Sequence, residues 1–597
     1  MNKLRKSKLT VFLAAILFFC FAHFDVFAQE VEDMKMIIEE LNRLKQRVGV
    51  LEQKVSVQEG IINSQRRVIE KVSEISPEIK QAMLPPEPKV LVKEFILEGV
   101  YLFSEKDFEP VLGIYRNKQL GKRELEKAAD DLTAFYRSKG YITSLAYLPP
   151  QEISDNVVKF SVIEGRVGEV KIEEGQYAKK EVIESKMLVE QGQVLDYERV
   201  EKSIKAINRH PDREAKAVLL PGKDKASTDL LVKIEDTHSP WHFGVDYNNR
   251  GTDYTGKNRF GLTMRNTNLL GNDEMLSARL QAGKNIDEVY AGVIDYNFRI
   301  FNRDTRLGFY GLHSHADIGG PFQIIDPRGT ATMWGVYVKQ PLFDKDFGDP
   351  TLFNLSSVGT VGLDSASVEN KLLGQETSHD ELRMVKAGIS FDQEDSLGRT
   401  FVNHEIKIGI ADFLGSMDEH DASASRLDSG GQFTKYTSSF SRINRMPFST
   451  MLVASFKVQL TDNPLANSEQ LSLGGVDSIR GFPENDYLAD YGWISSFELR
   501  MPAFLVPAKV KMPFSTTGMS LRDSLQLVAF VDFGTGYLKR ARVGEVENKS
   551  LIGAGFGLRY EFNDHLRGKI DVGFPVGKEE PSDGASSKVH VGVQYEF

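Results

Sequence analysis

The alternation of apolar and polar residues from Trp241 to Phe597 constrains the fold of this chain more than any other feature. Successive side chains of a β-strand point to opposite faces, so a strand that alternates has one apolar face and one polar face. The last nine residues show this arrangement clearly. Their apolar positions are Val589, Val591, Val593, Tyr595 and Phe597, and between them lie His590, Gly592, Gln594 and Glu596.

Charged residues occupy the polar face of this region regularly. A soluble β-sandwich also alternates, but it does not normally place charges on its inward face, whereas a membrane barrel is apolar outside and polar inside. The mean hydropathy of -0.29 is compatible with a barrel, because lumen-facing residues offset lipid-facing ones. Lipid tolerates no open sheet edge, so such a sheet must close. At ~22 residues per strand with its connection, residues 239–597 predict a transmembrane antiparallel β-barrel of about 16 strands in the bacterial outer membrane.

The first 28 residues are typical of a signal peptide. A basic start that includes Lys3 and Arg5 precedes an apolar run from Thr10 to Phe21, and Val26-Phe27-Ala28 places small residues at the two positions that define a cleavage site. A membrane anchor is the alternative, but spanning needs ~20 apolar residues. Cys20 is the only cysteine and lies in this segment, so the mature protein is expected to start at Gln29 without a disulfide.

Residues 29–76 carry a heptad pattern. Apolar residues step by three and four positions from Met34 to Val72, which predicts a coiled coil over 34–72 and possible self-association through it. An amphipathic helix on the protein's own surface is the alternative. Prolines at positions 77, 85, 86 and 88 then predict a stiff linker over 77–89.

Two segments of about 75 residues, 90–165 and 166–238, each predict the element order β-α-α-β-β. The expected strands are Val90–Leu97, Ser144–Leu148, Val157–Ile163, Val167–Glu173, Ala215–Leu220 and Thr228–Glu235. The expected helices are Glu105–Tyr115, Lys122–Lys139, Lys179–Glu190 and Tyr197–Asn208. The periplasmic region is therefore predicted to hold two small α+β domains in tandem.

Three motifs resemble the two-partner secretion transporters, the ShlB/FhaC/HecB type within the BamA-like superfamily. The run from Phe135 to Tyr141, followed by Val162-Ile163-Glu164-Gly165, is similar to the first POTRA (polypeptide-transport-associated) domain of that family. The segment from Trp241 to Asp273 is similar to its opening barrel hairpin. The segment Leu473 to Phe482 is similar to the conserved loop motif of the superfamily. The resemblance covers residues 90–597.

The resemblance implies that a loop, expected at 474–492, folds back into the barrel, where its arginine meets an acidic residue of the wall. The matching residues are Ile479, Arg480, Gly481, Phe482 and Asp532. The alternation independently places Asp532 in the lumen if its neighbours Val531 and Phe533 face lipid. The alternative is that Arg480 and Asp532 are two unrelated lumen charges. Glycines at 553, 555 and 557 are expected to leave room for an inward loop.

The resemblance also implies a function. An unfolded partner protein would be recognised in the periplasm by the POTRA domains and secreted through the barrel. A BamA-like assembly factor and a passive porin or surface receptor are the alternatives. No catalytic grouping, metal site, cofactor or nucleic-acid-binding face is predicted. The expected partners are a secreted protein, outer-membrane lipids and the barrel assembly machinery, for which the terminal aromatic Phe597 resembles an insertion signal.

Edge strands of the two modules are candidate docking sites, because small mixed sheets can capture an extended chain by strand addition. In such modules the second strand usually lies at the edge. The candidate residues are Ser144, Leu145, Ala146, Tyr147 and Leu148 in the first module, and Arg213, Ala215, Ala217 and Leu219 in the second. The modules could instead be spacers. Relatives often carry a short N-terminal helix that plugs the barrel, but the long heptad segment here does not favour that role.

Overall fold

The computed structural model describes residues 88–173, 175–301, 304–345, 354–507, 509–511, 520–562 and 565–597. The predicted signal peptide and coiled coil lie outside these residues, as does most of the linker, so these remain predictions. Contacts divide the chain into two compact units. The smaller includes residues up to 98, 105–131 and 147–160, and the larger includes 99–104, 132–146 and 161–597. No helix in the described part of the chain has the length and apolar character to cross a membrane.

The first module contains a three-stranded sheet in the order β2-β5-β4 and one long helix. The helix α4 forms because its apolar residues recur on one face, where Leu125, Ala128, Leu132 and Tyr136 are buried. The bounds are β1 Val90–Val92, β2 Glu94–Glu98, α3 Glu109–Leu112, β3 Lys118–Leu120, α4 Lys122–Ser138, β4 Leu145–Tyr147 and β5 Val157–Ile163. The single strand expected over Val90–Leu97 is in fact two strands, and β1 pairs with β3, which the pattern did not predict.

The Glu164 carboxylate explains why two distant sequence motifs accompany each other. Its Oε1 atom accepts hydrogen bonds from the backbone N–H groups of Tyr101 and Leu102, both at 2.9 Å, and from the Tyr136 hydroxyl at 3.0 Å. Burial, together with the nearby Glu164 charge, raises the pKa of the Tyr136 hydroxyl, so it remains a donor at neutral pH. The two motifs therefore meet in one buried hydrogen-bonded cluster.

The second module is a sheet in the order β6-β8-β7 with two helices. Its bounds are β6 Arg166–Glu173, α5 Lys180–Glu184, α6 Tyr197–Asn208, β7 Arg213–Pro221 and β8 Ser227–Asp236. Helix α6 begins where the Asp196 side chain accepts a hydrogen bond from the Glu198 N–H. The helix expected over Lys179–Glu190 is wrong beyond Glu184. There the chain leaves the helix and Lys186 forms a buried ion pair of 2.6 Å with Asp273.

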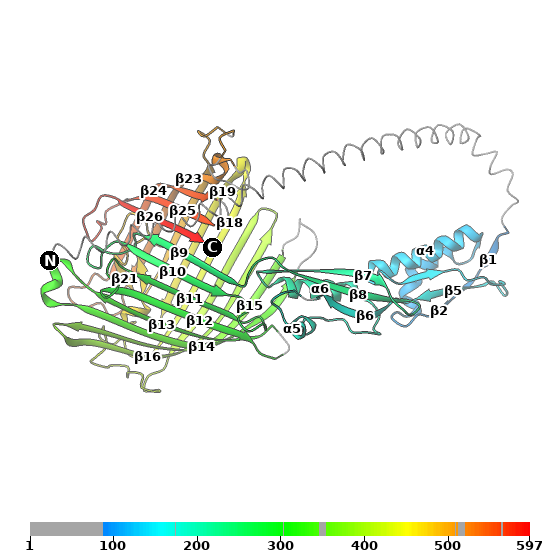
Figure 1. The fold of residues 1–597 in the computed structure, drawn as a ribbon, viewed down its shortest axis with the longest axis horizontal. Coiled ribbons are helices and arrows are strands. Elements are labelled where there is room, and N and C mark those ends of the chain that lie inside the picture. The colour runs from blue at the N-terminus through cyan, green and yellow to red at the C-terminus, as the bar shows by residue number, and fades with distance from the viewer. Residues whose placement is uncertain are drawn as a thin grey trace, which may run out of the picture. The chain divides into compact units, whose positions relative to one another are not determined.

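Sixteen antiparallel strands form a closed barrel (Figure 1), as the alternation predicted. They are β9 Trp241–Asn248, β10 Arg259–Asn266, β11 Met275–Ala282, β12 Val289–Arg299, β13 Arg306–Asp317, β14 Arg328–Lys345, β15 Asn354–Leu372, β16 Gln375–Asp395, β17 Gly398–Gly409, β18 Phe433–Met446, β19 Thr450–Thr461, β22 Tyr491–Pro502, β23 Leu525–Tyr537, β24 Asn548–Phe562, β25 Leu566–Pro575 and β26 Lys588–Glu596. The last strand closes the barrel against the first, with Val593 opposite Tyr247. The Phe597 N–H also donates to the Phe243 carbonyl at 2.8 Å.

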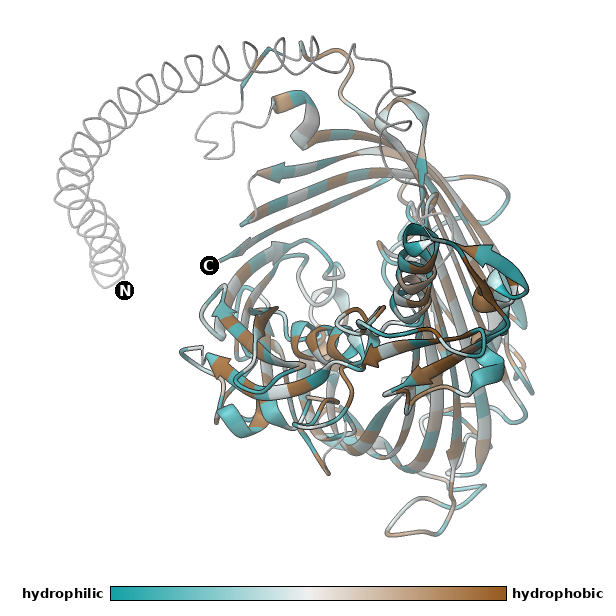
Figure 2. Cartoon of the chain, turned by 90° about the vertical axis from the view of Figure 1, so that its right-hand side faces the viewer, coloured by the Kyte–Doolittle hydropathy of each residue, from teal (hydrophilic) through white to brown (hydrophobic). Residues whose placement is uncertain are grey.

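Hydrophobic and hydrophilic residues alternate along the barrel strands (Figure 2), and the burial pattern assigns the faces. On β9, Trp241, Phe243 and Val245 each leave more than two-fifths of their surface exposed, as expected of side chains that face lipid. On β23, Asp532 is fully buried between its half-buried apolar neighbours Val531 and Phe533. The barrel therefore has the apolar exterior and charged interior that the sequence predicted.

One connection of the barrel turns back into it. Residues 462–490, between β19 and β22, contain the 3₁₀ turn η5 Asn467–Glu469 and a small hairpin of β20 Leu471–Leu473 and β21 Tyr487–Ala489. The loop predicted at 474–492 therefore begins earlier in the structure, at residue 462. Its last two predicted residues, Tyr491 and Gly492, already belong to β22. This connection is called the inward loop below.

Candidate functional site

The inward loop has its own apolar core inside the barrel. Its side chains Leu473, Ile479 and Phe482 are fully buried, and they pack with Ile494 of β22 and Leu551 of β24. Two of the predicted site residues, Ile479 and Phe482, therefore anchor the loop by burial. Fully burying one such side chain is worth about 1.5–3 kcal/mol.

Glycines of the wall allow the loop backbone to approach. A Cβ atom on Gly553 of β24 would lie 1.9 Å from the Arg480 carbonyl oxygen, and one on Gly573 of β25 would lie 2.5 Å from the Gly481 nitrogen. Gly481 itself has a φ of +106°, a conformation that side chains rarely adopt. The expectation that inward glycines make room for a loop is confirmed at Gly553.

The structure brings Arg480 and Asp532 together in a two-pronged ion pair. The arginine Nε donates to Oδ2 at 2.8 Å and its Nη2 donates to Oδ1 at 2.9 Å, while the Arg480 backbone N–H donates to Oδ2 at 3.0 Å. Asp532 is fully buried and Arg480 is 5% exposed. Paired hydrogen bonds of this geometry are strong and directional. The loop arginine therefore fixes the loop to the wall at β23.

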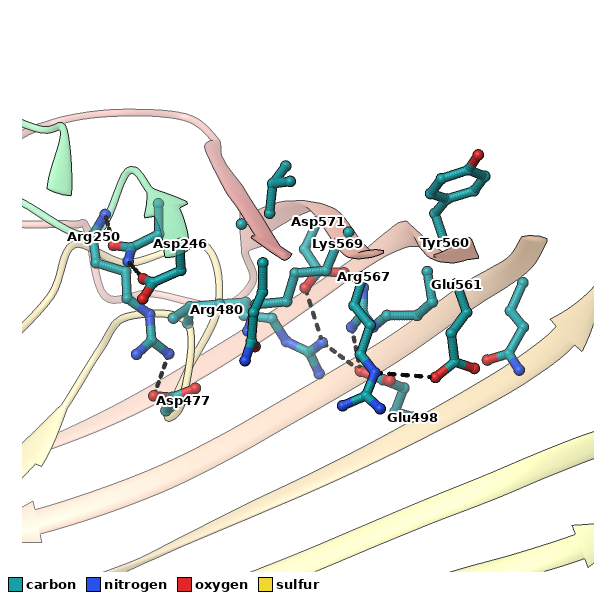
Figure 3. A pocket seen from close by; sticks show the side chains of 18 of the residues that line it. Asp246, Arg250, Asp477, Arg480, Glu498, Tyr560, Glu561, Arg567, Lys569 and Asp571 are labelled. Carbon is teal, nitrogen blue, oxygen red and sulfur yellow. Dashed lines mark hydrogen bonds and ion pairs between the residues drawn. The ribbon is translucent and has the colours of Figure 1, made fainter. Parts of the chain in front are cut away.

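Further charges of the wall complete the network around Arg480, as Figure 3 shows. Glu498 of β22 accepts from Arg480 Nη1 at 2.7 Å, from Arg559 of β24 at 2.9 Å and from Arg500 at 2.7 Å. Asp571 of β25 accepts from Arg559 at 2.6 Å. The Arg480 guanidinium also lies 3.4 Å from the centre of the Phe530 ring. Three carboxylates thus balance three arginines beside a lumen cavity of about 720 Å³.

The sequence did not single out Glu498, Arg559 and Asp571. All three occupy inward positions of alternating strands, which is the only signal the sequence offers for them. It also missed a second buried ion pair, in which Arg426 of the β17–β18 connection donates to Asp490 at 2.5 Å. Asp490 ends the inward loop and also accepts from the Lys539 N–H at 2.7 Å. Three connections of the barrel are therefore joined at Asp490.

The candidate docking residues of the first module alternate between core and surface. Ser144 and Ala146 are buried, whereas Leu145 and Tyr147 are 41% and 42% exposed, and Leu148 is half-buried. Strand β4 lies at the edge of its sheet. Only its outward side chains, Leu145 and Tyr147, can meet a docked chain.

In the second module, the side chains named from the sequence face inward. Ala215 is buried, and Ala217 and Leu219 pack against the same core. Arg213 is also buried and donates to Asp273 at 2.9 Å. Strand β7 is nevertheless an edge strand, and its exposed apolar side chains are Val218 and Leu220. Docking on this strand stays a prediction, and a docked chain would face Val218 and Leu220 rather than the side chains of Ala215, Ala217 and Leu219, because successive residues of a strand point to opposite faces.

A closed sixteen-stranded barrel that holds its own inward loop, and follows small α+β modules, defines an outer-membrane transporter with periplasmic POTRA domains. Comparison with known families agrees with this class. The family model "POTRA domain, ShlB-type" matches residues 90–165, and the model "Haemolysin secretion/activation protein ShlB/FhaC/HecB" matches residues 356–560. In its first module and in much of its barrel, the chain is therefore similar to the ShlB/FhaC/HecB type of two-partner secretion transporters.

Similar proteins carry related names. The heme/hemopexin transporter protein HuxB of Haemophilus influenzae is 25% identical over 66% of this chain and 69% of its own length. The outer membrane transporter CdiB of Dickeya dadantii is 23% identical over 82% of this chain and 83% of its own length. The solved structure of CdiB from Escherichia coli shares the fold, with a TM-score of 0.64 and 20% identity over 88% of this chain and 93% of that one. A structure of BamA from Haemophilus ducreyi lacking POTRA domains 1–3 also shares it, with a TM-score of 0.52 and 12% identity over 85% of this chain and 100% of that one.

Replacing Arg480 with Ala should release the inward loop while the barrel still assembles. The substitution leaves Asp532 buried without its cation, and breaking a buried pair in this way costs about 3–5 kcal/mol. Hydrogen exchange of the full chain in lipid nanodiscs should therefore accelerate across Leu471–Ala489 and remain slow in β23 and β24. The control Arg567→Ala removes an exposed arginine beside the same cavity and should change nothing. Unchanged protection of the loop in Arg480→Ala would contradict this assignment.

Proposed function

We propose that the protein recognises an unfolded partner protein in the periplasm through its POTRA modules and secretes it through the barrel to the cell surface or medium. The observation that carries this proposal is the inward loop, which is held in the lumen by buried apolar side chains and by the ion pair of a buried arginine. A passive pore has no need of a wall built to receive such a loop. The role is one of transport, without an enzymatic step.

The contacts of Arg480 support a gating role for the loop. The loop occupies lumen space that a moving chain would need, and its hold on the wall rests on apolar burial together with the ion pair to Asp532. Because the two residues come from separate elements, the loop can leave the wall without breaking a barrel strand. Release of Ile479, Arg480, Gly481 and Phe482 would then open the path.

Capture of the partner is proposed at the edge strands β4 and β7. An edge strand offers unpaired backbone groups to an extended chain. The outward Leu145 and Tyr147 on β4, and Val218 and Leu220 on β7, add apolar contacts beside that edge. Backbone pairing would give affinity, and these side chains would give preference for apolar residues at alternate positions of the partner.

Proline at successive positions of β7 tests this capture. Lys216→Pro, Ala217→Pro and Val218→Pro each remove one backbone N–H, and alternate N–H groups of an edge strand face outward. We expect secretion to fall for the substitutions that remove an outward N–H. Val218→Ser is the matched control, because it keeps the backbone donor and should retain secretion better. Normal secretion by all three proline variants, with normal amounts of barrel in the membrane, would contradict docking on this edge.

Three further partners belong to the proposal. Outer-membrane lipids would contact the apolar face of the barrel, where side chains such as Phe243 and Trp334 are exposed. The barrel assembly machinery would insert the chain through the terminal strand that ends at Phe597. The predicted coiled coil over 34–72 would allow copies of the protein to associate in the periplasm.

Deletion of the gene, followed by proteomics of the medium and of the outer membrane, tests the function as a whole. Secretion predicts the loss of one large protein from the medium, and complementation with the intact gene should restore it. The composition of the outer membrane should otherwise stay unchanged. A broad loss of outer-membrane barrels would instead indicate an assembly factor, and unchanged fractions would indicate a passive pore or receptor.

A further inference from the structure

Three lysines form a row across the inner wall of the barrel, on strands distant from Arg480 in sequence. Lys386 of β16 lies directly opposite Lys407 of β17, and Lys407 lies directly opposite Lys435 of β18. Each side chain is at most 20% exposed. Like charges opposite each other destabilise a sheet, so this lysine row requires carboxylates beside it.

Two carboxylates form ion pairs with the row, and only one of them belongs to the wall, where Glu405 of β17 adds a further negative charge near Lys407 and Lys435. Asp364 of β15 lies 2.7 Å from the Lys386 ammonium and 3.8 Å from that of Lys407. The other, Glu469, comes from the inward loop. Its carboxylate lies 3.7 Å from Lys407 and in close contact with Lys435, while its carbonyl oxygen accepts from Lys435 at 3.1 Å. The lysine row is therefore balanced at rest by a residue of the loop.

An apolar patch of the wall lies beside the row and also receives the loop. Leu465 and Ala466 are fully buried, and they belong to one cluster with Leu382 and Met384 of β16 and Phe433 of β18. Met384 and Phe433 are two residues from Lys386 and Lys435 along the same strands, so they share the inward face with the lysines. The segment 465–469 thus places an aliphatic side chain on the patch and a carboxylate, four residues later, on the row.

We propose that the patch and the lysine row form a docking site for the transported chain, and that segment 465–469 occupies this site at rest as a built-in ligand. The ligand class is a peptide segment with an aliphatic residue followed four positions later by Asp or Glu. The inference rests on the proposed function, since it needs a chain that enters the lumen.

The balance of charges explains why such a segment is preferred. Removal of the loop takes away the ion pairs that Glu469 makes with Lys407 and Lys435 and leaves only the wall carboxylates Asp364 and Glu405 near the row. An arriving carboxylate restores the lost ion pairs, whereas a neutral side chain does not. Because the arriving segment and segment 465–469 cannot occupy the site together, binding of the partner favours the state in which this part of the loop is displaced. The site therefore couples recognition of an acidic segment to opening.

Channel recordings on the full-length protein in planar lipid bilayers test the site. The probe is a synthetic peptide with the sequence of residues 463–471, added to the bath, and the control peptide carries Gln in place of its Glu. Glu469→Gln weakens the built-in ligand, so the acidic peptide should block this variant at lower concentration than the wild type. In the Glu469→Gln variant, the acidic peptide should also block at roughly tenfold lower concentration than the control peptide. This is the difference expected for one charge-assisted hydrogen bond.

Variants of the row complete the design. Adding Lys407→Gln and Lys435→Gln to Glu469→Gln should abolish the preference for the acidic peptide, whereas adding Lys435→Arg should keep it. Lys339→Gln, on β14, is the matched control because it removes another lysine of the barrel and should leave the preference intact. Equal block by the two peptides in Glu469→Gln, or a preference that survives loss of both lysines, would overturn the proposal. Peptide block is measured without secretion, so failure of the proposed function would appear separately in the deletion experiment.

Discussion

The rest of this structure depends on the ion pairs that one buried guanidinium makes with carboxylates inside a closed barrel. In water, an ion pair of Arg480 would add little stability to a loop. Within the lumen, Arg480 makes a two-pronged ion pair with the fully buried Asp532. Such a pair is strongly destabilising to break on one side, because the remaining charge stays buried. The loop fits the wall closely. Glycines on β24 and β25 make room for its backbone, and its arginine joins the carboxylates that the wall arginines also bind.

The inward loop is held at three places that differ in chemistry. Near its start, Leu465 packs on the wall and Glu469 joins the lysine row. At its middle, Arg480 binds Asp532, and at its end Asp490 joins Arg426. The first two attachments join the loop to barrel strands, and the third joins it to the β17–β18 connection. A transporter that must stay closed to solutes yet open to one protein gains from several such contacts, since a single chance fluctuation does not release all of them.

The sequence predicted the elements whose signals are local, and missed those that depend on register. Alternation alone placed Asp532 in the lumen, and the strand count of sixteen followed from length. Glu498, Asp571 and the three lysines lie at inward positions of their strands, but alternation does not say which inward charges meet, because that depends on the stagger between strands far apart in sequence. Helix α5 ends at Glu184, and two residues later Lys186 pairs with Asp273, a contact across 87 residues that no local pattern contains. The position of β7 at the sheet edge follows from the order of elements, whereas the exposure of Val218 and Leu220, rather than of Ala215, Ala217 and Leu219, depends on how the strand packs on its own core.

If the inward loop must leave the wall for a protein to pass, a reversible disulfide between the loop and the wall should stop secretion. Ile479→Cys and Gly534→Cys suit this purpose, because a Cβ atom on Gly534 would lie 3.4 Å from Ile479 Cγ1, and the sequence has no cysteine other than Cys20. Secretion should be measured in cells with the pair oxidised and again after addition of reductant, with each single cysteine as control. We expect secretion to stop in the oxidised double variant and to recover on reduction. Undiminished secretion through a fully oxidised barrel would contradict it.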